Sequence, residues 1–185
     1  RAKLEDFDGD VRRAVENGLN AIEQLKKDYQ GLKIVGVEKW RNLPLRSLVD
    51  YDDPTLMFTG FIDAVFQHDN GYLIVDYKTD KNSNYASEHK RQLSVYRKMH
   101  SILEGIPEDQ ISTCIVFVAL RGGINTGRFD WSIETEKRNA FPTFLKHLQV
   151  VLEWKKDPKK FIQNLLDKPS DDPLYLAIKE KLQSN

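Results

Sequence analysis

The chain has 185 residues, of which 40% are hydrophobic and 30% charged, a composition typical of a soluble globular protein with one hydrophobic core. Its 28 basic residues are balanced by 28 acidic ones, which excludes a globally basic surface, so a nucleic-acid partner would have to be held by a local patch. No apolar run approaches the length of a membrane span, and we expect no membrane association.

The first predicted element is an amphipathic helix over Leu4–Tyr29, which Gly31 ends. Its apolar residues recur at helical spacing: Val11, Ala14, Val15, Leu19, Ile22 and Leu25. A strand is expected over Lys33–Trp40, and Glu38 lies in it. A polar, turn-rich loop is expected over Leu43–Thr55.

Two further strands, Met57–Phe66 and Tyr72–Lys78, flank the triplet Asp69–Gly71. An Asp-Asn-Gly between two apolar runs is the strongest short-range signal for an antiparallel hairpin. Ser87 is the expected N-cap of a helix that continues to Leu103.

The second half of the chain continues the alternation of strands and helices. A continuous apolar run predicts a central strand over Ile111–Leu120, with Cys114 packed in the core. Because Cys114 is the only cysteine, a disulfide framework is excluded and a reducing compartment, such as the cytoplasm or nucleus, is favoured. A turn at Arg121–Gly123 precedes a strand over Arg128–Ile133.

A long amphipathic helix is expected over Phe141–Lys156, ended by Asp157 and Pro158. Short helices broken by prolines are expected over Phe161–Leu182. This order of elements predicts an α/β fold with a central mixed β-sheet flanked by helices. We expect one domain over 1–160 and a C-terminal helical tail over 161–185.

The hairpin carries the residues that most need an explanation. Asp63 lies within its first strand, and Asp76 and Lys78 lie two residues apart at the end of its second, on one face of an extended chain. An acid within a buried strand costs several kcal/mol unless it is paired. Two acids and a lysine on adjacent strands therefore indicate a divalent cation. The alternatives are a buried ion pair between Asp63 and Lys78, or Asp76 as a former of a strand-end turn.

These residues form an ordered set of motifs. Gly-x-x-Asp at Gly60–Asp63 is followed by Asp-x-Lys-Thr at Asp76–Thr79, and then by Gln92 and Tyr96, which share one face of a helix. The set resembles the RecB-type branch of the PD-(D/E)xK nuclease superfamily, from about Val35 to Phe117. The resemblance implies a restriction-endonuclease-like core. Some members hold an iron–sulfur cluster with four cysteines, which one cysteine cannot build.

The resemblance also implies an activity, a metal-dependent DNase with Mg²⁺ or Mn²⁺ as cofactor. Asp63, Asp76 and the backbone carbonyl of Tyr77 would be the metal ligands, and Lys78 would orient the attacking water. Gln92 and Tyr96 would position Lys78 or touch the substrate. The implied partners are DNA with single-stranded character and a helicase or other DNA-processing domain, in repair or recombination. Exonuclease and endonuclease action both stay open.

Several residues have two interpretations. Glu38 either lies near the metal site or pairs with Lys39 or Arg41 across the sheet. The four histidines share no metal-ligand spacing, and we expect them on the surface or in the core. A basic cluster either holds phosphates or forms a solvated helix face; its members are Lys81, His89, Lys90, Arg91, Arg97 and Lys98.

One feature departs from the family pattern. RecB-type nucleases usually carry a histidine on a helix upstream of the first strand, and no histidine precedes His68. Either the motif lies before Arg1, or Glu16 or another helix acid replaces it, or the site is degraded. Degradation favours the alternative function, a catalytically silent nucleic-acid-binding or scaffolding domain. Since the later motifs are all intact, we expect the chain to be a fragment of a longer polypeptide.

Overall fold

The computed structural model describes residues 8–80, 82, 86–121, 129–135, 140–167, 176 and 180. The chain divides into two compact units, Arg1–Pro142 and Thr143–Asn185. In chain order the elements are α1 (Gly9–Asp28), β1 (Lys33–Pro44), the 3-10 turn η2 (Leu45–Ser47), β2 (Met57–His68), β3 (Gly71–Lys78), α2 (Ala86–Glu104), the 3-10 turn η3 (Glu108–Gln110), β4 (Ile111–Arg121), β5 (Phe129–Thr135), α4 (Phe141–Lys156) and α5 (Pro158–Leu166).

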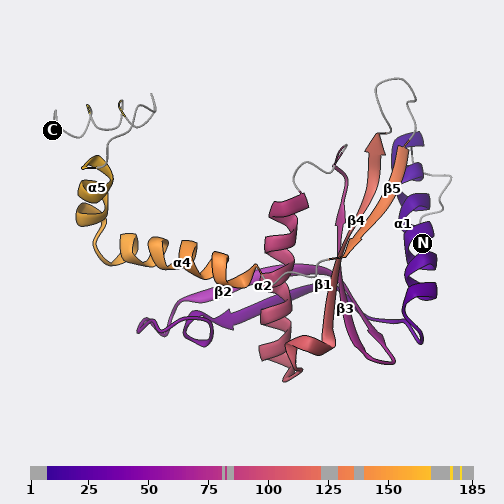
Figure 1. Cartoon of the computed structure of the whole chain (residues 1–185), viewed down its shortest axis with the longest axis horizontal. Helices are drawn as coiled ribbons and strands as arrows, with labels where there is room; N and C mark the ends of the chain where they lie inside the picture. Colours follow the sequence, from indigo (N-terminus) through magenta and orange to yellow (C-terminus); the bar gives the residue numbers. More distant parts are fainter. Residues whose placement is uncertain are drawn as a thin grey trace. The chain divides into compact units, whose positions relative to one another are not determined.

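The five strands form one mixed sheet in the order β1-β2-β3-β4-β5. Strands β3 and β4 are parallel, and α2 is the crossover between them, whereas the other neighbours are antiparallel. Helices α1 and α2 lie on opposite sides of the sheet (Figure 1). The α/β fold with a mixed sheet flanked by helices is therefore confirmed.

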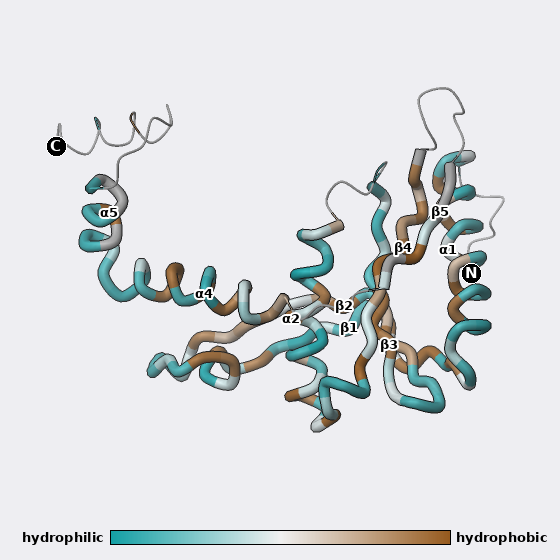
Figure 2. Tube along the Cα trace, in the orientation of Figure 1, coloured by the Kyte–Doolittle hydropathy of each residue, from teal (hydrophilic) through white to brown (hydrophobic). Residues whose placement is uncertain are grey.

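The hydrophobic core follows from the alternation of side chains along the central strands. Figure 2 shows hydrophobic residues concentrated in β3 and β4, which lie between the two helices. The core cluster on the α1 side consists of Ala21, Leu25, Ala64, Phe66, Leu73, Val75, Cys114, Val116 and Val118. Cys114 is fully buried there, as expected, and burial raises the pKa of its thiol to about 12.

The β2–β3 hairpin forms as predicted. His68 pairs with Gly71 across a two-residue turn. Gly71 has φ +141°, and a Cβ there would lie 2.1 Å from the carbonyl oxygen of Gln110, so the turn requires glycine. His68 supports the turn: its ring lies against Tyr29 and its Nδ1 accepts a hydrogen bond from the Asn70 amide.

Helix boundaries differ from the sequence prediction in two places. Helix α1 begins at Gly9 rather than Leu4, because the Asp8 carboxylate caps it by accepting hydrogen bonds from the amides of Asp10 and Val11. Ser87, expected as the N-cap of α2, lies inside the first turn of that helix.

The strands run longer than predicted. Strand β1 continues to Pro44 because its residues keep pairing with β2 through Met57. Strands β2, β4 and β5 extend to His68, Arg121 and Thr135. The predicted turn at Arg121–Gly123 and the prolines expected in the tail lie largely outside the described residues.

The far ends of β1 and β2 form a two-stranded arm, since β2 pairs with β3 only from Ala64 onward. On this arm Trp40 and Phe61 are cross-strand partners with ring centroids 4.5 Å apart in an edge-on arrangement. Both side chains are 54% exposed. None of the helices that the structure describes has the length and apolar character needed to cross a membrane.

Candidate functional site

The candidate site begins where β2 separates from β3. The last pair of the ladder between the two strands is Ala64 with Val75. Asp63, the residue before Ala64 in the chain, lies just outside the ladder. Asp63 Oδ2 accepts a hydrogen bond of 2.8 Å from the Tyr77 amide. A carboxylate thus takes the place of the next ladder acceptor and links the two strands at the point where they part.

Asp76 and Lys78 lie at the end of β3, next to this opening. Asp76 is 3% exposed, and its Oδ2 lies 2.7 Å from Lys78 Nζ. This contact is an ion pair, and Oδ2 otherwise has no hydrogen-bond partner in the described part of the chain. Burial raises the pKa of Asp76, and Lys78 opposes that shift.

Helix α2 supplies the remaining polar groups. Lys78 Nζ donates a long hydrogen bond of 3.5 Å to Gln92 Oε1, and Gln92 Nε2 donates one of 2.7 Å to the Tyr96 hydroxyl. Burial raises the pKa of Tyr96, and the negative charges of Asp76 and Asp63 raise it further. The structure therefore brings together all five side chains singled out by the motifs: Asp63, Asp76, Lys78, Gln92 and Tyr96.

Two simpler interpretations of these residues are wrong. Lys78 pairs with Asp76 rather than with Asp63. Asp76 lies within the pairing range of β3 and β4 and is buried, so it does not form a strand-end turn.

The structure shows why the first motif, Gly60–Asp63, begins with a glycine. A Cβ at this position would lie 2.8 Å from Tyr96 Cε1, so only glycine lets β2 approach the Tyr96 ring. The residue is thus a packing requirement of the site itself.

We expect Gly60→Ala to destabilise the protein by roughly 1–3 kcal/mol, since the new Cβ would overlap the buried Tyr96 ring and one of the two must shift. Denaturant unfolding measures the loss. Gly18→Ala is the matched control: its Cβ would meet Val118 Cγ1 at 3.8 Å, an ordinary contact, in a helix that favours alanine. Equal stability of Gly60→Ala and the wild type would contradict this packing role.

The acids offer oxygen ligands suited to a hard cation. The described residues contain no group of three or more His, Cys, Asp or Glu side chains that could hold a metal ion. A site here would consist of Asp63, Asp76 and a backbone carbonyl, the donor set that Mg²⁺ and Mn²⁺ accept. The buried Asp76 carboxylate, whose Oδ2 contacts the cationic Lys78 but has no further partner among the described residues, is the observation that fits a cation.

Glu38 lies close to this site along the sheet. It falls between the pairs Val37–Ala64 and Lys39–Ile62, which places it opposite Asp63. Its φ of +46° is in the left-handed region, unusual for a non-glycine residue in a strand. Glu38 and Asp63 line one hollow of about 390 Å³, together with Ile34, Val37, Ala64 and Tyr77. The strained backbone could not be predicted from the sequence.

The alternative partner proposed for Glu38, Arg41, is engaged elsewhere. Arg41 Nη1 lies 2.7 Å from Glu104 Oε1, and its Nη2 lies 2.9 Å from His100 Nδ1. Glu16, the helix acid considered as a replacement for the upstream histidine, forms an ion pair with Arg12 on α1. Helix α1 covers the opposite side of the sheet from α2 (Figure 1).

Members of the predicted basic cluster differ in their surroundings. Lys81 lies outside the described residues. Arg91 pairs with Glu88, and Lys98 with Glu108. His89 Nε2 lies 2.9 Å from Asp80 Oδ2, a contact that histidine spacing alone could not indicate.

His100 is a buried structural histidine. It is 2% exposed, and burial, reinforced by the Arg41 charge, lowers its pKa to about 4. A neutral ring lets Nδ1 accept the hydrogen bond from Arg41.

This shift predicts a loss of stability in acid. Below pH 6.5 the unfolded chain protonates His100 while the folded chain does not, so the free energy of unfolding falls by up to about 3 kcal/mol between pH 6.5 and 4. Denaturant titrations across that range measure it. His100→Gln removes this part of the slope, whereas the exposed His147→Gln leaves it. An unchanged slope in His100→Gln would contradict the assignment.

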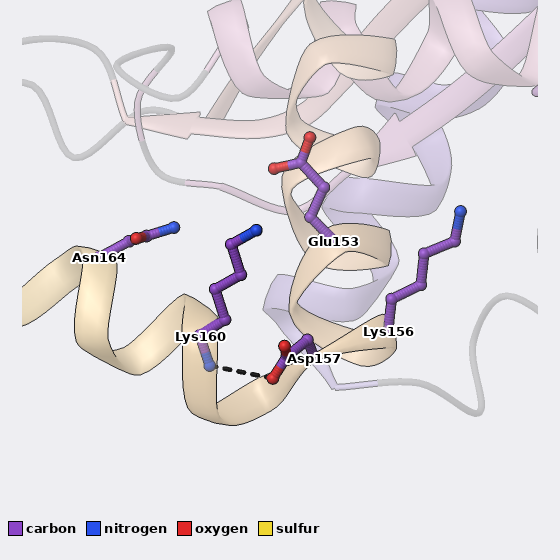
Figure 3. Close-up of a pocket in the computed structure, with 5 residues that line it drawn as sticks. All are labelled: Glu153, Lys156, Asp157, Lys160 and Asn164. Carbon is purple, nitrogen blue, oxygen red and sulfur yellow. Dashed lines mark hydrogen bonds between the residues drawn. The ribbon is translucent and has the colours of Figure 1, made fainter.

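A second hollow, of about 440 Å³, belongs to the unit Thr143–Asn185 (Figure 3). It is lined by Glu153, Lys156, Asp157, Lys160 and Asn164, none of which the motifs single out. Asp157 Oδ1 accepts a hydrogen bond of 3.0 Å from the Lys160 amide and so caps α5, with Pro158 at its first position. This hollow therefore marks a helix junction.

Comparison with known proteins places this arrangement in a family. The family model of the PD-(D/E)XK nuclease superfamily matches residues 2–170. The chain therefore belongs to the PD-(D/E)XK nuclease superfamily. Over 60 residues it is 40% identical to one of the subunits of the ATP-dependent helicase/nuclease of Clostridioides difficile (strain 630). That match covers 30% of this chain and 5% of the relative, and with the family match it confirms the RecB-type resemblance.

Proposed function

We propose that the chain is a divalent-metal-dependent nuclease that hydrolyses phosphodiester bonds in DNA. The observation that supports it most strongly is the contact chain Asp76–Lys78–Gln92–Tyr96 beside Asp63. Membership of the superfamily gives the class of chemistry, and the contacts give each residue a role.

In this proposal Asp63, Asp76 and the main-chain carbonyl of Tyr77 hold the metal ion. Mg²⁺ or Mn²⁺ would supply Lewis acidity and a more acidic bound water. Lys78 Nζ, held between Asp76 and Gln92, orients the attacking water and stabilises the negative charge that develops on the phosphate. Tyr96 fixes the Gln92 amide and so keeps Lys78 in place.

The test is incubation of the protein with single- and double-stranded DNA, in Mn²⁺ or in EDTA. We expect cleavage in Mn²⁺ that EDTA abolishes. End-labelled substrates separate exonuclease from endonuclease products. Absence of cleavage of either substrate would contradict the proposal. Metal-independent binding without cleavage would support the second candidate, a silent nucleic-acid-binding domain.

We also propose that the substrate strand has single-stranded character. Phe61 is two residues from Asp63 on β2, so both side chains leave the same side of the strand, about 7 Å apart. Phe61 and Trp40 together present an exposed aromatic surface on which an unpaired base can stack.

Stacking predicts a change in affinity and fluorescence. Trp40→Ala and Phe61→Ala should each weaken binding of an oligothymidylate in EDTA by about tenfold, since stacking contributes roughly 1–3 kcal/mol per base. Binding should also quench tryptophan fluorescence in the wild type but less in Trp40→Ala. Met57→Ala, an exposed apolar side chain on the same arm, is the matched control. Equal effects of Met57→Ala and Phe61→Ala would indicate a general apolar contact instead.

The biological setting is part of the same proposal. The relative is a subunit of a helicase/nuclease, which supports a helicase domain as partner. A role in DNA repair or recombination stays a prediction. The expected domain limits, 1–160 and 161–185, and the reducing compartment stay predictions.

A further inference from the structure

A second polar contact lies beside the candidate site, between Asp80 and His89. His89 Nε2 is 2.9 Å from Asp80 Oδ2, and the two side chains are 19% and 39% exposed, His89 being the more buried. An ionised carboxylate only accepts hydrogen bonds, so Nε2 donates to it and the ring orientation is fixed.

The position of His89 relates it to the contact chain of the site. It lies three residues before Gln92 and seven before Tyr96 on α2, so the three side chains share one helical face. Asp80 follows Lys78 by two residues. The contacts Lys78–Gln92 and Asp80–His89 therefore connect the end of β3 to α2 at successive positions.

The ring of His89 lies at the end of the central strands. Its centroid is 6.3 Å from that of Phe117, which is the cross-strand partner of Lys78. Burial raises the pKa of Asp76, and His89 is among the groups that oppose this rise, so His89 lies within electrostatic reach of the buried acid. His89 is also partly open to solvent, unlike the buried His100.

A purely structural contact uses one nitrogen of the ring. The other, Nδ1, makes no hydrogen bond within the described part of the chain. When Nδ1 also carries a proton, the ring is a cation, and its Nδ1–H is a hydrogen-bond donor that the Asp80 contact does not use. This donor lies next to the candidate site, which would bind a nucleic-acid strand. Phosphate oxygens are the usual partners of such donors.

We propose that His89, oriented by Asp80, is a substrate-contacting residue that donates a hydrogen bond from Nδ1 to a phosphate of the bound strand, next to the phosphate that is cleaved. The proposal rests on the proposed nuclease function. It assigns to α2 a phosphate contact in addition to the positioning of Lys78.

Two substitutions of His89 distinguish the roles of the two ring nitrogens. The amide of glutamine reaches the position of Nε2, so His89→Gln keeps the contact with Asp80 and loses the Nδ1 donor. The amide of asparagine reaches the position of Nδ1, so His89→Asn keeps a donor toward the substrate and loses the contact with Asp80. Arg12→Gln on α1, which removes a cation paired with Glu16 on the opposite side of the sheet (Figure 1), is the control.

The measurement is the affinity for a single-stranded oligonucleotide in EDTA at several salt concentrations. We expect His89→Gln to bind about five- to tenfold more weakly, with a salt slope smaller by about 0.7, as for the loss of one phosphate contact. His89→Asn should bind more tightly than His89→Gln. In Mn²⁺ the loss in His89→Gln should fall mainly on KM rather than kcat.

Wild-type affinity and salt slope in His89→Gln would overturn the inference, as would a weaker affinity in His89→Asn than in His89→Gln. The latter result would make the pair a link between β3 and α2 only. Failure of the wild type to bind any oligonucleotide would overturn the proposed function and this inference together. That outcome is seen with the wild type alone, whereas failure of this inference alone is seen only by comparing the variants with a wild type that binds.

Discussion

Lys78→Ala is expected to reduce DNA cleavage by about 10²–10³-fold and to leave DNA binding within about twofold of the wild type. Lys78 Nζ contacts Asp76 and Gln92. In the function we propose it stabilises the charge that develops on the phosphate, so its loss should remove stabilisation of the transition state. Single-turnover cleavage and equilibrium binding measure the two quantities separately.

The matched control is Lys98→Ala, on α2, where the lysine pairs with Glu108 instead. Because Lys78→Ala leaves the buried Asp76 without its cation, unfolding curves must first show that the variant is folded under assay conditions. Parallel loss of cleavage and binding would make Lys78 a phosphate contact, contrary to the role proposed for it.

The second large effect concerns the metal ion. Millimolar Mn²⁺ should raise the melting temperature of the wild type, because a ligand at 100 times its Kd stabilises the folded state by about 2.7 kcal/mol. Asp63→Ala and Asp76→Ala should each lose this rise, since each removes one of the two carboxylates at the opening between β2 and β3.

Asp109→Ala, which removes an exposed acid, controls for non-specific binding and should keep the full rise. Thermal unfolding with and without Mn²⁺ gives the rise in melting temperature for the wild type and for each of the three variants. An equal rise in the wild type and in both site variants would place the ion elsewhere.

Local sequence patterns were sufficient to predict the hairpin and the residues at its open end. Alternating apolar residues and the Asp-Asn-Gly turn set the register of β2 and β3, and that register brings Asp63 to the Tyr77 amide. The helical spacing of Gln92 and Tyr96 likewise put both side chains on the face that meets Lys78.

Other features depend on contacts between distant residues. The length of β1 follows from its pairing with β2, and the left-handed backbone of Glu38 occurs within that pairing. Arg41 carried no sequence signal for its partners, because His100 and Glu104 come from a helix about 60 residues further along the chain. The Asp80–His89 contact was missed for a related reason, since the sequence between the two residues has no periodic pattern.

The most direct test of the central claim is anomalous diffraction from a crystal of the protein soaked in Mn²⁺. We expect one strong peak at the open end of β2 and β3, where Asp63, Asp76 and the Tyr77 carbonyl would hold the ion. A crystal with no peak there, or with its strongest peak in the hollow lined by Glu153 and Asp157, would contradict the account.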